Sequence, residues 1–136
     1  MAEVSLWEQA FVRAYIVAEK RDRYLAFLKG RKHRRKILDR LNHSLDYDER
    51  YATPLDARYK IPKALIVYLI GRGVDRLTCC LMADGHSADG RHMRLEQAVL
   101  ELLDSHWGAL IICPPIPIAV YKPEDIGDLV LLARLP

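Results

Sequence analysis

The basic stretch between Lys20 and Arg40 has the clearest chemical meaning in this sequence. It holds ten of the chain's 21 lysines and arginines, opposed only by Asp22 and Asp39, and so carries a net charge of +8. Because the whole chain carries +3, the other 115 residues carry −5. This asymmetry indicates an acidic partner. Clustered cations displace counterions from phosphates, so nucleic acid is the most concrete candidate. The residues predicted to make the contacts are Lys29, Arg31, Lys32, Arg34, Arg35, Lys36 and Arg40.

Other interpretations of the same stretch stay open. The partner could instead be an acidic protein or lipid surface, and the cations could simply form a solvated helix face. In that last case they would pair with acids elsewhere in the chain, such as Asp46, Asp48 and Glu49. No helix-turn-helix, RNA-recognition or zinc-finger pattern frames the stretch. Nearby aromatic residues could stack on bases, namely Tyr24, Phe27 and Tyr47.

A second group of chemically capable residues lies between Asp84 and His92. This segment contains two carboxylates and two imidazoles, from Asp84, His86, Asp89 and His92. Such groups can ligate a metal or perform acid–base chemistry, and the segment lies between an expected strand and an expected helix. The spacing matches neither a zinc site nor an EF-hand loop. The alternative is turn chemistry, because Asp-Gly pairs are common in tight turns.

The remaining motifs predict neither a catalytic site nor a cofactor. Gly71-Arg72-Gly73 lacks the Gly-Lys-Ser/Thr ending of a phosphate loop, and no serine lies in a GxSxG motif. The three cysteines, Cys79, Cys80 and Cys113, are an odd number with an adjacent pair, which is a poor disulfide framework. We therefore expect buried thiols in a reducing cytoplasm. The first residues do not resemble a signal peptide, and no apolar run is long enough for membrane insertion.

The first half of the chain has helical periodicity. Apolar residues recur at three- and four-residue spacing from Leu6 to Ala18, with Ser5 and Glu8 as a capping box. The pattern continues to Leu28, and Gly30 is expected to end it. A second helix is predicted from about residue 32 to residue 43, with its inner face formed by Ile37, Leu38 and Leu41. Residues 46–56 are polar and predict a loop. Pro62–Ile70 predicts a third helix, with a strand as the competing interpretation because the run is rich in β-branched residues.

The second half has mainly strand patterns around one helix. Strands are expected at residues 77–83, 109–113, 116–121 and 128–135, and an amphipathic helix at residues 94–106. The predicted class is α+β, with a helical N-terminal half packed on a four-stranded, mainly antiparallel β-α-β-β-β sheet. We expect a single domain of residues 1–136, with a helical part over about 1–72 and a sheet part over about 74–136. Consecutive apolar residues in the strands predict that both sheet faces are buried.

The C-terminal half resembles a family of small uncharacterised bacterial proteins. The resemblance covers roughly residues 77–135. It is carried by the strand ending in Ala83, Asp89-Gly90-Arg91, Leu95-Glu96-Gln97-Ala98, Gly108-Ala109-Leu110-Ile111 and the strand pair around Ala119-Val120-Tyr121 with its closing Leu131-Leu132. It implies a compact cytoplasmic bacterial protein, and it implies no activity, cofactor or catalytic residue.

Three hypotheses for function follow from the sequence. The first, which we favour, is a non-catalytic binding protein whose segment 20–40 meets an acidic partner, nucleic acid or protein. The second is an enzyme or metal-binding protein that uses the Asp84–His92 loop. The third is a structural or accessory subunit of a homo-oligomer, most simply a homodimer formed through any sheet face that the helices leave bare.

Overall fold

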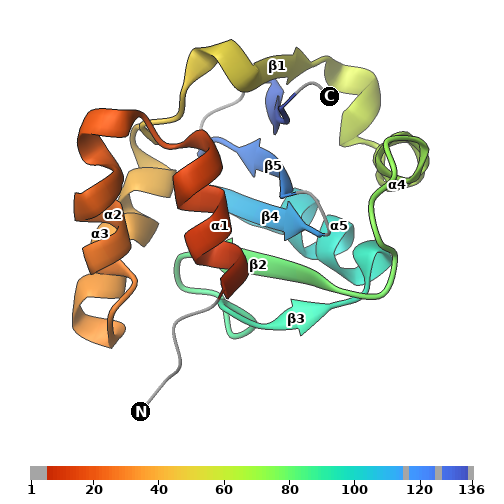
Figure 1. Cartoon of the computed structure of the whole chain (residues 1–136). Helices are drawn as coiled ribbons and strands as arrows, with labels where there is room; N and C mark the ends of the chain where they lie inside the picture. The colour runs from red at the N-terminus through yellow and green to blue at the C-terminus, as the bar shows by residue number, and fades with distance from the viewer. Residues whose placement is uncertain (1–5, 115–116, 125–126, 135–136) are drawn as a thin grey trace.

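The computed structural model describes residues 6–114, 117–124 and 127–134, and it has three layers (Figure 1). A sheet forms the middle layer. One face carries α1 (Leu6–Tyr15), α2 (Arg21–Phe27) and α3 (Arg31–Asn42), and the other carries α4 (Pro62–Gly71) and α5 (Leu95–Asp104). Short 3₁₀ turns lie at Ala18–Lys20, Glu49–Tyr51 and Ala57–Lys60. The predicted α+β class is confirmed.

The sheet has six strands rather than the predicted four. Its order is β1-β6-β5-β4-β2-β3, and every pairing is antiparallel. The expected strands correspond to β2 (Cys79–Ala83), β4 (Ala109–Cys113), β5 (Ile118–Lys122) and β6 (Leu129–Leu132). The two additional strands, β1 (Ala52–Leu55) and β3 (His92–Met93), lie at the two edges.

The edge strands were not predicted because they lack a strand pattern. In β1 only Leu55 is buried, and Pro54 has no backbone N–H to donate, which an edge strand tolerates. The prediction of a loop over residues 46–56 was therefore wrong for its last part. Strand β3 has only two residues, too few for alternation to be visible.

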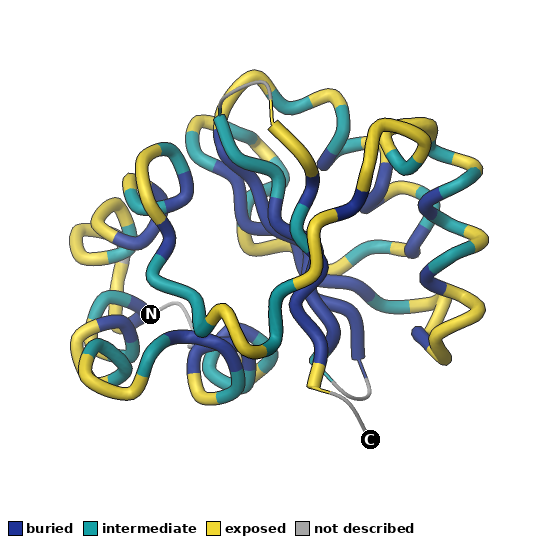
Figure 2. The backbone as a smooth tube through the Cα atoms, turned by 90° about the horizontal axis from the view of Figure 1, so that it is seen from above, coloured by how far each residue is buried: buried dark blue, intermediate teal, exposed yellow. Residues whose placement is uncertain are grey.

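Both faces of the sheet are buried, as the apolar strands predicted. In β4 the side chains of Ala109, Ile111 and Cys113 pack with α4 and α5, while Leu110 and Ile112 pack with α1–α3. Figure 2 shows the buried strands between outer layers whose exposed residues face solvent. In the described part of the chain helices pack on both faces of the sheet, and the homodimer expected from a bare face stays a prediction.

The N-terminal helices are shorter than the periodicity suggested. The chain turns at residues 16–20, so the stripe that begins at Leu6 is divided between α1 and α2. Ser5, the expected cap, lies outside the described residues. Gly30 has a φ of 130°, and it precedes α3 as its N-cap. None of the helices in the described segments has the length and apolar character needed to cross a bilayer.

Candidate functional site

Helix α3 carries most of the predicted contact residues, and its inner side fixes which of them face solvent. Ile37, Leu38 and Leu41 are buried against the sheet face that contains Cys80 and Leu110. Arg34 lies three, four and seven residues before them, so it continues the same stripe toward the start of the helix. Its guanidinium therefore points inward, toward the sheet and α1.

The Arg34 guanidinium joins two carboxylates from distant parts of the chain. Its Nη1 and Nη2 atoms donate to Glu8 Oε1 and Oε2 at 2.7 and 2.8 Å. Its Nε and Nη2 atoms donate to Asp89 Oδ2 and Oδ1 at 2.8 and 2.9 Å. Both contacts are bidentate, the geometry for which the planar guanidinium fork is suited. The arginine thus ties α3 to α1 and to the loop after β2.

The network lies in a region with little solvent. Glu8 is the one charged residue of the described chain that is buried, and its Oε2 atom lies 3.9 Å from the Cys80 thiol. Burial alone lowers the pKa of Arg34, but hydrogen bonds to Asp89 and Glu8 outweigh it and raise the pKa above its usual value. Arg34 is therefore permanently charged, and it pairs with Glu8 and Asp89 inside the protein.

The end of α3 is fixed as firmly as its beginning. Asn42 Nδ2 donates to Asp84 Oδ2 at 3.0 Å, and Asn42 Oδ1 accepts from the Gly108 N–H at 2.7 Å. The Leu41 carbonyl accepts from the Tyr121 hydroxyl at 2.6 Å. A Cβ atom on Gly108 would lie 1.9 Å from that carbonyl oxygen, so only glycine allows this approach.

The Asp84–His92 loop serves largely as a support for α3. Asp89 binds Arg34 and also accepts from the Ala83 N–H at 3.0 Å, while Asp84 binds Asn42 and lies 3.7 Å from Arg35. The two regions singled out independently in the sequence therefore meet, and their opposite charges partly neutralise each other.

The two histidines of this loop have separate environments. His86 Nε2 lies 2.7 Å from Glu101 Oε2, while its Nδ1 accepts from the Ala88 N–H at 2.9 Å. His92 is exposed on β3, opposite Cys80. Within the segments that the structure describes, no three His, Cys, Asp or Glu side chains are placed to hold a metal ion.

The outer side of α3, together with Lys29 in the turn before it, presents exposed cations. We call Lys29, Lys32, Arg35 and Lys36 the basic face; all four are exposed. Among the described residues, no carboxylate lies within 4.0 Å of Lys29, Lys32 or Lys36. The Arg35 side chain is 75% exposed despite its long contact with Asp84. These charges are free to meet a partner.

One aromatic ring accompanies the basic face. Phe27 is partly exposed, and the Lys36 ammonium lies 5.7 Å from its ring centroid. The other two aromatic candidates are engaged internally. Tyr24 is buried, with its hydroxyl donating to Asp46 at 2.6 Å, and Tyr47 packs against Tyr121.

The remaining predicted contact residues differ in their placement. Arg40 is half-buried and lies near Asp46, whose pKa it helps to lower. Arg31 begins α3.

Glu8, the more buried partner of Arg34, was predicted from the sequence only as part of a helix cap. The spacing of residue 34 before 37, 38 and 41 was the available signal that Arg34 faces inward and needs a buried acid.

Comparisons with protein-family models, with curated proteins and with solved structures find no match in any of the three. The resemblance over residues 77–135 therefore rests on its sequence features alone.

Proposed function

We propose that this chain is a non-catalytic binding protein whose basic face meets an acidic partner, most concretely the phosphate backbone of a nucleic acid. The observation that carries the proposal is the row of exposed lysines at positions 29, 32 and 36, none of which has a carboxylate within 4.0 Å in the described chain. Unpaired cations at the start of a helix are unfavourable in themselves, because they lie at the positive end of its dipole. An external anion would relieve this repulsion.

The geometry favours recognition of a backbone rather than of base sequence. The contacts would come from three lysines and one exposed arginine, and contacts of such side chains to phosphate carry no base information. No helix-turn-helix, RNA-recognition or zinc-finger pattern is present to direct them to base edges. Phe27 could add a stacking surface for an unpaired base. We therefore expect similar affinity for different sequences and a steep loss of affinity as salt increases.

The enzyme hypothesis receives less support from the same contacts. Asp84 and Asp89, the two carboxylates that it requires, are hydrogen-bonded to Asn42 and Arg34. Releasing them for chemistry would detach the loop from α3.

The test is fluorescence anisotropy with short labelled RNA and DNA duplexes over a series of salt concentrations. Lys32→Ala/Lys36→Ala should weaken binding to every sequence alike and reduce the slope of log K against log salt by about 1 for each lysine removed. The matched control is Lys60→Ala/Arg72→Ala, which removes two exposed positive charges at the two ends of α4, in the opposite layer, and should bind like the wild type. No binding at about 50 mM salt, or an equal loss in the control, would overturn the proposal.

A further inference from the structure

The outer side of the α4 and α5 layer has an apolar surface that the fold does not cover. Helix α4 is apolar almost all round, since Lys63 is its only charged residue, and such helices are normally enclosed by other elements. Its inner residues Leu65 and Leu69 are fully buried. In contrast, Val67 is 61% exposed, and Ile61, the residue before the helix begins, is 59% exposed. Four of the seven large apolar side chains exposed in the described chain belong to this layer: Ile61, Val67, Ile70 and Leu100.

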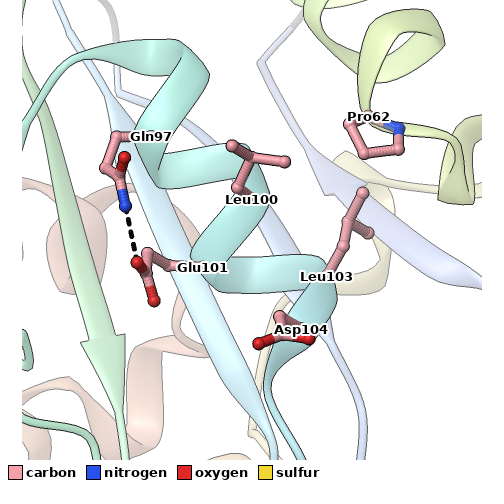
Figure 3. Close-up of a pocket in the computed structure, with 6 residues that line it drawn as sticks. All are labelled: Pro62, Gln97, Leu100, Glu101, Leu103 and Asp104. Atoms are coloured by element: carbon pink, nitrogen blue, oxygen red, sulfur yellow. Dashed lines mark hydrogen bonds between the residues drawn. The ribbon is translucent and has the colours of Figure 1, made fainter.

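Two hollows lie on this surface. One, of about 460 Å³, is lined by Pro62 at the start of α4 and by residues of α5, Asp104 among them; Figure 3 shows Leu100 and Leu103 on the side of α5 that faces Pro62. The other, of about 560 Å³, is lined mainly by apolar atoms of Tyr59, Ile61, Val67 and Tyr68. Ridges and hollows on one surface are what a self-complementary interface requires.

Opposite charges flank the hollow that Pro62 and Leu103 line. Exposed Lys63 follows Pro62 at the start of α4, and exposed Asp104 ends α5. Among the described residues, neither Lys63 nor Asp104 has an oppositely charged group within 4.0 Å. A two-fold axis through this hollow would place Lys63 of one copy at Asp104 of the other, and the pairing would occur twice.

We infer that the α4/α5 face, formed by Ile61, Lys63, Val67, Leu100 and Asp104, is a homodimer interface whose occupant is a second copy of this chain. Val67 and Ile61 of one copy fill the hollow beside Leu100 of the other, while Lys63 meets Asp104. The basic face lies in the opposite layer, so dimerisation leaves it accessible.

Sedimentation equilibrium from about 10 to 500 µM protein tests the inference. The wild type should change from the 15.7 kDa monomer to twice that mass, and Val67→Glu should weaken association at least about tenfold. Leu6→Glu is the matched control: Leu6 is 78% exposed but lies on α1, in the other layer, and the variant should dimerise like the wild type. Circular dichroism verifies that both variants are folded.

Charge exchange tests the orientation of the two copies. Lys63→Asp and Asp104→Lys should each weaken the dimer, and the combined variant should recover it. A wild type that stays monomeric throughout, a mass that grows without limit, an equal effect of Leu6→Glu, or a combined variant that does not recover would each overturn the inference.

Discussion

On the inner side of α3, Arg34 makes two bidentate ion pairs and lies mostly out of solvent. On the outer side Lys32 and Lys36 are exposed, and no carboxylate of the described chain lies within 4.0 Å of them. Both sides belong to one run of basic residues that looks uniform in the sequence. The inner cation stabilises the fold, and the outer cations are available to a partner. The net charge of a segment therefore overstates the charge that it offers to a partner. Helical periodicity shows which of its residues face the core and which face solvent.

The choice of side chain follows the same division. The inner site has an arginine, whose planar fork can satisfy two carboxylates at once, while three of the four residues of the basic face are lysines, which are well hydrated and mobile. The loop that binds Arg34 likewise has a structural role, because Asp89 binds Arg34 and Asp84 binds Asn42.

The largest effect is expected from Arg34→Met. Removing the guanidinium leaves Glu8 buried and Asp89 without its partner, which should lower the free energy of unfolding by about 3–5 kcal/mol in urea titrations. Arg34→Lys should recover only part of this, because one ammonium cannot make both bidentate contacts. The control, Arg35→Met, should cost at most about 0.5 kcal/mol. Equal costs for Arg34→Met and Arg35→Met would contradict the assignment of inner and outer sides.

A smaller but clear cost is expected from Gly108→Ala at the other end of α3. The added methyl would collide with the Leu41 carbonyl oxygen and force the helix away from β4, with a loss of about 1–3 kcal/mol or more in the same titration. Gly71→Ala, at the end of α4, is the contrasting variant, because a Cβ atom there meets nothing within 4 Å. It should leave stability unchanged or raise it slightly. If Gly108→Ala does not lower the stability, then α3 is not held closely on the sheet.

The third prediction concerns acid sensitivity near α2. Burial raises the pKa of Asp46, but hydrogen bonds from Lys20 and Tyr24 outweigh it, so the pKa lies below its model-peptide value of 3.8. A carboxyl with a lowered pKa stabilises the fold at pH values above about 4 and loses that contribution as the pH falls further. Unfolding measured between about pH 3 and pH 6 should therefore show a weaker acid dependence for Asp46→Asn. An identical pH profile in both proteins would argue against this contact.

The smallest effect on stability should have the opposite sign. Lys32→Glu replaces a cation by an anion in the first turn of α3, where the helix dipole favours negative charge, and should stabilise the fold by about 0.3–1 kcal/mol. Thermal unfolding at low salt would detect the gain. A loss of stability would show that Lys32 has a structural role.

The sequence predicted the elements whose patterns are long. The helices near α3, α4 and α5 and the strands near β2, β4, β5 and β6 were found because their apolar residues recur regularly. Strand β1 was not found because it has four residues, of which one is a proline and one is buried. It forms only because β6 offers it an edge, and such pairing is not encoded locally.

The candidate site could be predicted in part for a similar reason. The lysines of the basic face are visible in the sequence, and the exposure of Lys32 and Lys36 follows from the helical periodicity of α3. The partnership of Glu8, Arg34 and Asp89 joins residues separated by 26 and 55 positions, so only the tertiary fold brings them together. Periodicity could nevertheless have placed Arg34 on the buried side.

The most direct test of the account combines stability and binding in one variant. Lys32→Glu/Lys36→Glu should remain folded with undiminished stability while losing anisotropy-detected binding to RNA and DNA duplexes at about 50 mM salt. That result would show that the outer cations bind a partner without supporting the fold. Wild-type affinity in this variant, at every salt concentration tested, would contradict the claim that the basic face is the binding surface.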